Sequence, residues 1–120
     1  MVTPINLADK LGRFSEQWSP RIISELNDNH VLLAKVQGEF IWHQHADEDE
    51  MFLVLSGNLT IELRDGAIRL GPGEMVVIPK GTEHRPVAEQ EVHLMLIEPK
   101  VTRHTGDVVS ERTVHRYASI

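Results

Sequence analysis

Three histidines and one glutamate stand at a spacing that can hold a metal ion. His43 and His45 are one residue apart, Glu50 follows shortly after them, and His84 lies further along the chain. Residues i and i+2 of an extended segment project from the same face, so His43 and His45 can reach one point. Three imidazoles and one carboxylate suit a first-row divalent ion better than calcium or magnesium, which prefer all-oxygen shells. The sequence therefore predicts a metal site formed by His43, His45, Glu50 and His84.

The predicted cofactor is one divalent transition-metal ion. Manganese, iron, nickel, cobalt and zinc all accept this ligand set, so the residues do not distinguish them. A six-coordinate ion with four protein ligands keeps about two positions for water, substrate or dioxygen. At such positions an ion can polarise a carbonyl or enediol oxygen, activate water or bind dioxygen. Apart from the ligands, the sequence offers no strong general base.

The residues around the ligands are interpreted by their alternation along the chain. Ile41 and Phe52 share the face of the ligands and are expected to line a pocket. Trp42 faces the other way and is expected to pack or to lie in an interface. The acidic stretch 46–49 is interpreted as a solvated loop that turns the chain, in which Asp49 could orient a ligand imidazole.

The elements that must position these side chains are predicted to be strands. Short runs rich in Val, Ile and Leu alternate with turn residues. The runs are Val31–Val36, Phe40–His45, Met51–Leu55, Leu59–Leu63, Ala67–Leu70, Met75–Pro79 and Val92–Glu98. Asp65-Gly66 between two of them predicts a hairpin with a type I′ turn, which needs positive φ at both positions. This pattern indicates an all-β antiparallel sandwich or barrel.

Both ends are expected to add short elements. Apolar residues at helical spacing within residues 7–14 allow a short helix with Asn6 as its N-cap. Pro20 ends any helix, and Arg21–Leu26 is interpreted as an edge strand. Val108–Tyr117 is expected to be extended. No linker or repeat divides the chain, so residues 1–120 are interpreted as one domain with its core at about 31–99.

Composition excludes several function classes. The chain has 120 residues and a net charge of −6, from 12 basic and 18 acidic residues. This balance argues against binding to nucleic acid or to anionic membranes. There is no cysteine, which excludes disulfides and thiolate ligands. The N-terminus lacks the apolar region of a secretory signal, and the longest apolar runs are too short to span a membrane, so a cytoplasmic location is expected.

The spacing of the ligands and glycines resembles the cupin family. Its first motif corresponds here to Gly38, His43, His45, Glu50 and Gly57, and its second to Gly73, Pro79, Gly81 and His84. The chain departs from the pattern by a one-residue shift after Gly38, and by Ala88 where the family has asparagine. The run GEFIWHQHADEDEMF and the tail TGD look like small single-domain cupins described as mannose-6-phosphate-isomerase-like, a label of kinship that does not establish sugar isomerisation.

The resemblance implies a fold and a range of functions. The fold would be a double-stranded β-helix (jelly-roll) barrel, whose terminal segments 1–30 and 100–120 lie at a homodimer interface or cover a sheet edge. Cupins include isomerases, lyases and dioxygenases, so the first hypothesis is a metal-dependent enzyme acting on a small polar organic substrate. The alternatives are a non-catalytic module that binds a small molecule, and a barrel in which the ion is purely structural.

Other polar side chains are assigned no role in the site. The remaining histidines lack a motif and are interpreted as structural or exposed: His30, His93, His104 and His115. Some basic side chains could bind an anionic substrate, but no Gly-rich phosphate loop or Arg cluster accompanies them, so a solvated surface role is preferred. These are Lys35, Arg64, Lys80 and Arg85.

Overall fold

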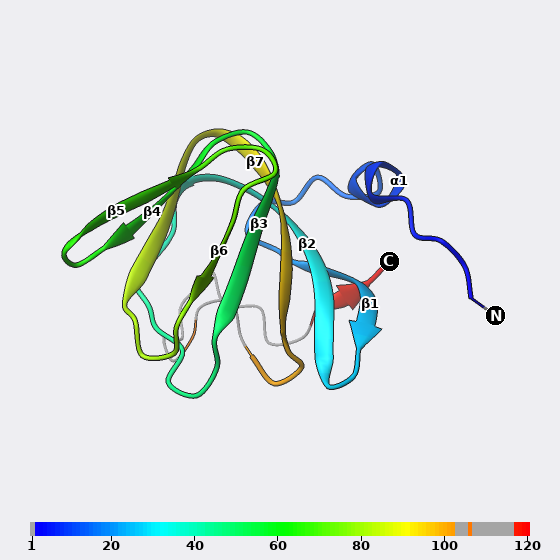
Figure 1. The fold of residues 1–120 in the computed structure, drawn as a ribbon. Coiled ribbons are helices and arrows are strands. Elements are labelled where there is room, and N and C mark those ends of the chain that lie inside the picture. The colour runs from blue at the N-terminus through cyan, green and yellow to red at the C-terminus, as the bar shows by residue number, and fades with distance from the viewer. Residues whose placement is uncertain (1, 103–105, 107–116) are drawn as a thin grey trace.

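The computed structural model describes residues 2–102, 106 and 117–120, and its elements form an all-β jelly-roll barrel with one short helix (Figure 1). In chain order these are α1 (Leu7–Leu11), β1 (Arg21–Leu26), β2 (Asn29–Glu39), β3 (Glu50–Ser56), β4 (Leu59–Leu63), β5 (Gly66–Leu70), β6 (Met75–Ile78), β7 (His84–Pro99) and β8 (Ala118–Ser119). Hydrogen-bonded neighbours follow the order β5-β4-β7-β2-β1-β8, and β3 joins β7 to β6.

The long strand β7 is the centre of this arrangement. It pairs with β2 along one edge, and with β4 and then β3 along the other. The sequence prediction of a strand over Val92–Glu98 was therefore too short. Pro86 and the polar stretch 89–91 interrupt the apolar pattern, which is why the first half of β7 did not look like a strand. Strands β4 and β2 nevertheless provide the hydrogen-bond partners of this first half.

The predicted strand Phe40–His45 was wrong as a regular element. The register between β2 and β7 shifts between Val36 and Gly38, where φ of Gly38 is +85°, and β2 ends at Glu39. Beyond this point the segment makes one isolated antiparallel bridge, between His43 and His84. A positive φ is readily available to glycine, so Gly38 permits the irregular pairing at the end of β2. Beyond β2 the segment stays beside the first part of β7, because the Phe40 N–H donates to the Pro86 carbonyl at 3.0 Å.

The predicted hairpin at Asp65-Gly66 is present, but its turn is not the expected type. Leu63 pairs with Gly66, so Arg64 and Asp65 form the two-residue turn between β4 and β5. The residues with positive φ in the described part of the chain do not include Arg64, Asp65 or Gly66. The alternating strands on either side therefore identified the hairpin correctly, while the type I′ interpretation was wrong.

The core fills the space between the curled strands. It consists of the buried side chains Leu32, Ala34, Val36, Phe52, Val54, Leu59, Ile61, Leu70, Ile78, Ala88, Val92, Leu94 and Leu96. Many of them alternate along β2, β3 and β7, as expected for strands with one face turned to the core. Ala88, which replaces the asparagine of the cupin pattern, is itself buried in this core.

The terminal segments lie along one side of the barrel. Helix α1 begins as predicted, because the Asn6 side chain accepts a hydrogen bond of 2.9 Å from the Asp9 N–H. Strand β1 pairs with β2, and β8 pairs in parallel with β1 as the outermost strand at this edge (Figure 1). Most of the predicted extended segment Val108–Tyr117 lies outside the described residues. In the described part of the chain, no helix is long and apolar enough to span a membrane.

Candidate metal centre

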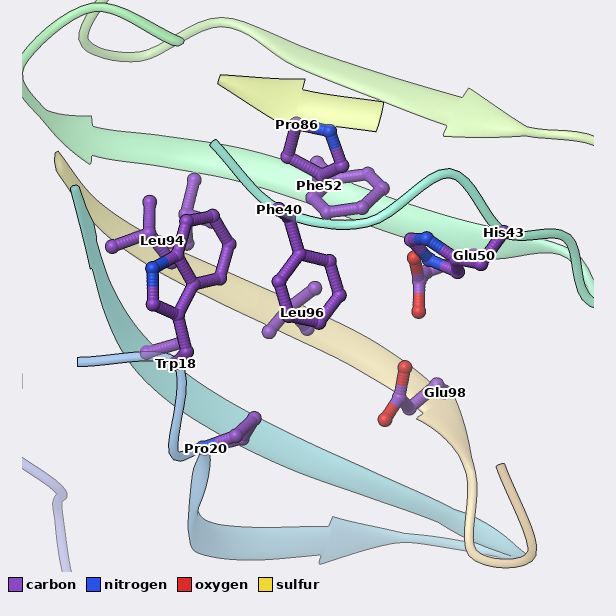
Figure 2. A pocket seen from close by; sticks show the side chains of 12 residues that line it. Trp18, Pro20, Phe40, His43, Glu50, Phe52, Pro86, Leu94, Leu96 and Glu98 are labelled. Carbon is purple, nitrogen blue, oxygen red and sulfur yellow. The ribbon is translucent and has the colours of Figure 1, made fainter. Parts of the chain in front are cut away.

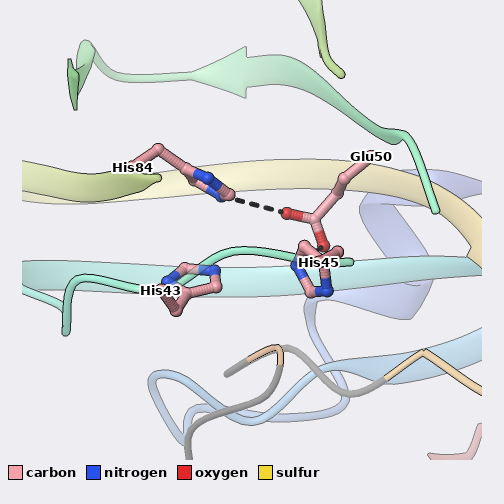
Figure 3. Close-up of side chains that lie close together, drawn as sticks. All are labelled: His43, His45, Glu50 and His84. Carbon is pink, nitrogen blue, oxygen red and sulfur yellow. Dashed lines mark ion pairs between the residues drawn. The ribbon is translucent and has the colours of Figure 1, made fainter. Parts of the chain in front are cut away.

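The four residues predicted as ligands come together at one point inside the barrel (Figure 3). His43 and His45 lie on the crossing segment between β2 and β3, while Glu50 and His84 are the first residues of β3 and β7. One potential ligand atom from each residue lies within 4.8 Å of all the others. All four side chains are buried, and His84 is completely inaccessible to solvent.

Backbone pairing brings His43 and His84 together. The His43 N–H donates to the His84 carbonyl at 3.0 Å, and the His84 N–H donates back at 2.9 Å. Side chains of directly paired residues project from the same face, and the two ring centroids are 4.3 Å apart. The Gly81 N–H donates to the His45 carbonyl at 2.7 Å, which fixes the turn before His84 against the crossing segment.

The acidic loop before Glu50 is held by the same turn. Asp49 is exposed, and its Oδ1 accepts a hydrogen bond of 2.9 Å from the Lys80 N–H. Asp49 therefore helps to close the loop, and backbone carbonyls orient the rings of His43 and His84. That Asp49 orients a ligand imidazole stays a prediction for His45.

Those carbonyls also determine which ring nitrogens are free to bind a cation. Nδ1 of His43 lies 2.9 Å from the Ile41 carbonyl oxygen, and Nδ1 of His84 lies 2.9 Å from that of Thr82. A carbonyl oxygen only accepts, so each Nδ1 must carry the proton. In the neutral rings Nε2 then keeps its lone pair. The Nε2 atoms of His43 and His84 are buried and lack a hydrogen-bond partner among the described residues.

Glu50 faces the imidazoles with both carboxylate oxygens. Its Oε2 lies 3.2 Å from His45 Nε2, and its Oε1 lies 3.6 Å from His84 Nε2. Burial on its own would raise the pKa of Glu50, but the neighbouring side chains of His45, His84 and Glu98 outweigh burial and hold the pKa well below its usual value. Burial and the neighbouring His84 lower the pKa of His43 to about 4. At neutral pH the site therefore contains an ionised carboxylate beside a neutral His43.

This donor set fits a cation. Two imidazole lone pairs and a carboxylate converge in a buried space, and electron pairs facing one another there are costly unless a positive charge lies between them. Bonds of about 2.1 Å to one ion would place neighbouring ligand atoms about 3 Å apart, which is close to the observed 3.2 Å between His45 and Glu50. The residues present can hold one divalent transition-metal ion.

A cavity of about 40 Å³ adjoins the cluster (Figure 2). His43, Glu50 and Glu98 are the polar residues of its wall. The rest of the wall consists of Trp18, Pro20, Ala34, Val36, Phe40, Phe52, Pro86, Leu94 and Leu96. Phe52 lines the cavity as expected, whereas Ile41 is not among the lining residues and Phe40 is. The reason is that residues 40–42 do not form a regular strand, so the two-residue alternation used for Ile41 does not hold there.

Glu98 is a residue of the site that sequence reasoning missed. It is 2% exposed, and its Oε2 has no hydrogen-bond partner among the described residues. Burial, together with the charge of Glu50, raises the pKa of Glu98 well above its usual value. A signal was present, because Val92, Leu94 and Leu96 are apolar and Glu98 continues their alternation. An acidic residue at a core-facing position is a candidate for function.

The remaining candidates lie away from the cavity. Lys35 Nζ donates to the Leu11 and Phe14 carbonyls at 2.7 and 2.6 Å. Arg64 and Arg85 lie over the Trp42 ring, at 3.9 and 5.6 Å from its centroid. The other residues considered are placed as follows: Lys80 is exposed, His30 is half-buried in β2, His93 binds Glu91 at 2.9 Å, and His104 and His115 lie outside the described residues.

Comparison with known proteins finds a matching family, similar sequences and similar structures. Residues 29–99 match the family model described as "Cupin domain". The uncharacterized protein YdbB of Bacillus subtilis is 48% identical over 81 residues, which cover 67% of this chain and 72% of that protein. A crystal structure of a cupin-2 domain containing protein from Shewanella frigidimarina is similar with a TM-score of 0.79 and 54% identity, covering 80% of this chain and 94% of that one.

A more distant relative has a name that refers to an activity. A putative dioxygenase of Saccharolobus solfataricus is 32% identical over 94 residues. The match covers 76% of this chain but 24% of that protein, so the chain spans about a quarter of its length.

Proposed function

Because the chain belongs to the cupin domain family, we propose that it is a metal-dependent enzyme acting on a small organic molecule. The ion would be held by His43, His45, Glu50 and His84. The observation that carries this proposal is the convergence of their ligand atoms within 4.8 Å, buried and adjoining a cavity. When bound, a divalent ion supplies Lewis acidity and, if it is redox-active, electrons for reactions with dioxygen.

The cavity wall narrows the class of substrate. Its polar residues, His43, Glu50 and Glu98, belong to or adjoin the ligand cluster, whereas the rest of the wall is apolar. A substrate suited to this wall has one polar end, bearing a carbonyl, hydroxyl or enediol oxygen, and a short apolar body. This is a more apolar substrate than the sequence led us to expect. The largely apolar wall also provides a surrounding of low dielectric, which strengthens electrostatic interactions inside the site.

Among isomerase, lyase and dioxygenase chemistry, we favour the dioxygenase type. The similarity to the putative dioxygenase of Saccharolobus solfataricus supports it. So does the apolar wall, because small apolar dioxygen enters such a cavity readily. In the part of the chain that the structure describes, Glu98 is the one carboxyl group of the wall outside the ligand set. An isomerase or lyase would have to use it for proton transfer.

A second candidate is a cupin that binds a small molecule or a structural ion without catalysis. The observation in its favour is the small size of the cavity, about 40 Å³, which corresponds to about three water molecules. A purely structural ion would have a saturated coordination shell. It would then show no spectral response to added oxygen-donor ligands.

The first experiment tests the metal. Protein purified anaerobically and reconstituted separately with iron, manganese, cobalt, nickel or zinc is expected to bind about one ion per chain. His45→Ala should lose this ion, because it removes a buried ligand nitrogen, and should keep the strand content of the barrel by circular dichroism. His93→Ala is the matched control, since His93 binds Glu91 away from the cluster. Wild-type metal content in His45→Ala, by elemental analysis, would refute the assignment.

The second experiment tests the reaction. Each reconstituted protein is mixed with a panel of small hydroxyketones, diketones and catechols, and oxygen uptake and product formation are followed. Consumption of dioxygen that requires both the ion and His45 supports a dioxygenase. Turnover without oxygen uptake indicates an isomerase or lyase. Tight binding without turnover across the panel indicates the non-catalytic alternative.

A further inference from the structure

Trp18 lines the cavity although it lies outside the family match. The matched region begins at residue 29, whereas Trp18 and Pro20 belong to the N-terminal segment. Figure 2 shows Trp18 at one end of the cavity and the carboxylates of Glu50 and Glu98 at the other. Part of the wall is therefore supplied by a segment that the cupin motifs do not include.

A sequence of ring contacts connects Trp18 with the ligand cluster. The Trp18 and Phe40 rings are stacked, with centroids 4.5 Å apart and planes at 11°. The edge of Phe40 in turn meets His43, with centroids 5.4 Å apart and planes at 90°. The Phe40 ring thus lies between Trp18 and the ligand residue His43. In this position Trp18 limits the length of the cavity and would not contact the ion.

The Trp18 side chain is held firmly in this place. Its backbone N–H donates to the Lys35 carbonyl at 2.8 Å, and its indole Nε1–H donates to the Gln37 carbonyl at 2.9 Å. Its φ of 58° is uncommon for a bulky residue, and such a conformation persists only where the surroundings determine it. Next to it, the Gln17 side chain binds Glu91 at 2.8 Å. The indole is therefore a fixed end wall.

We propose that Trp18 is a specificity-determining residue that sets how long an apolar substrate body can be. This inference rests on the proposed function, since it assumes that the polar end of the substrate binds the ion. In the wild-type protein the stack of Trp18 on Phe40 confines the substrate to a short apolar body. Removing the indole extends the cavity along its axis, away from the ion, and leaves the four ligands intact.

The test uses probes that grow by one methylene at a time. Alkyl hydroxamates, from acetohydroxamate to octanohydroxamate, bind first-row ions through two oxygens and carry an apolar tail. Their dissociation constants for cobalt-loaded protein are measured from the visible cobalt spectrum. Each methylene that finds space should tighten binding about fourfold. In the wild-type protein this gain in affinity should stop at a short tail. In Trp18→Ala it should continue over several more methylenes, so that this variant binds hexanohydroxamate at least tenfold more tightly than wild type does.

Trp42→Ala is the matched control. Trp42 is the other tryptophan of the chain, lies under Arg64 and does not line the cavity. Its variant should show the wild-type dependence on tail length. An unchanged dependence in Trp18→Ala would overturn the inference while leaving the proposed function in place. If wild-type cobalt protein does not respond even to acetohydroxamate, the proposed function fails, and the inference fails with it.

A second variant covers the case in which Trp18→Ala does not fold or does not bind cobalt. Trp18→Phe keeps an aromatic ring on Phe40 but is shorter and lacks the indole N–H. It should lengthen the tolerated tail by about one or two methylenes. If a folded, cobalt-loaded Trp18→Phe protein instead has the same limit of tail length as wild type, this result would count against Trp18 as a specificity-determining residue.

Discussion

Hydrogen bonds from Nδ1 to backbone carbonyls orient His43 and His84 before any ion binds. Each bond fixes the ring and leaves Nε2 as the atom with the free lone pair. Metal-binding histidines usually owe their tautomer to such a partner on the other nitrogen. Because the lowered pKa keeps His43 neutral at pH 7, that ring does not have to lose a proton when it binds a cation.

The buried ionisable groups predict how stability changes with pH in the metal-free protein. The pKa of His43 falls from 6.5 to about 4 on folding, so between these values only the unfolded chain protonates it, and stability falls as pH falls. Glu98 acts oppositely. Its pKa is raised from 4.5, so as pH rises above 4.5 the unfolded chain releases a proton that the folded protein retains, and stability falls.

The two contributions therefore oppose each other between pH 4.5 and 6.5. Glu98→Gln removes the second contribution. The free energy of unfolding of this variant, measured in urea, should fall more steeply than that of wild type as pH drops from 6.5 to 4.5. Glu89→Gln, at an exposed position, is the control. Parallel pH profiles for wild type and Glu98→Gln would show that Glu98 does not titrate as a buried group.

At the scale of elements, strand β7 places three parts of the site in register. Its first residue is His84, its second half carries Leu94 and Leu96 of the cavity wall and pairs with β3 and β2, and Glu98 stands near its end. Gly57, which follows β3, lets the chain pass close to β7. A Cβ there would lie 2.8 Å from the Glu91 carbonyl oxygen, and φ is +85°. Both the close approach and the backbone conformation need glycine.

Gly57→Ala should consequently be strongly destabilising. The backbone strain and the collision with a backbone atom together should cost about 3 kcal/mol of unfolding free energy, measured in urea. Gly66→Ala is the matched control, because nothing lies within 4 Å of its added Cβ and its φ is not positive. Its effect should stay within about 0.5 kcal/mol of wild type. Similar losses in both variants would contradict this account of Gly57.

At the scale of the whole molecule, the candidate centre joins segments that are distant in sequence. An ion bound there would connect the crossing segment, the start of β3 and the start of β7. At a concentration 100 times its dissociation constant, the ion should add about 2.7 kcal/mol to stability, which corresponds to roughly 10 °C in Tm for a chain of this size. Calorimetry should show this gain disappear with a chelator, and His45→Ala should lack it. A chelator-insensitive wild-type Tm would argue against the centre.

Assembly belongs to the same scale. We expect a homodimer, because cyclic dimers are the commonest soluble oligomers and strand β6 pairs only with β3 among the described residues. Met75 and Val77 on β6 are 53% and 48% exposed, so this edge is apolar as well as open. Light scattering should give twice the chain mass of 13.6 kDa. A mass of a single chain would contradict the dimer.

The sequence by itself determined which residues form the cluster and what type of fold holds them. His43, His45, Glu50 and His84 could be named because a donor set has a recognisable chemistry, and the strands because alternation of apolar residues is a local property. The hairpin of β4 and β5 and the capped helix at Asn6 were predicted for the same reason, since each depends on residues close together in the chain, although the turn lies at residues 64–65 and not at Asp65-Gly66.

Only the tertiary structure decided what surrounds the cluster. Phe40 rather than Ile41 lines the cavity, because β2 ends at Glu39 and regular alternation is lost in residues 40–42. Glu98 faces Glu50, and Trp18 stacks on Phe40. The two residues of each pair are far apart in the sequence, so no local sequence pattern predicts either contact. A pocket is bounded by segments that packing brings together. Its shape therefore depends on long-range contacts, whereas its ligands can be recognised from their types and spacing.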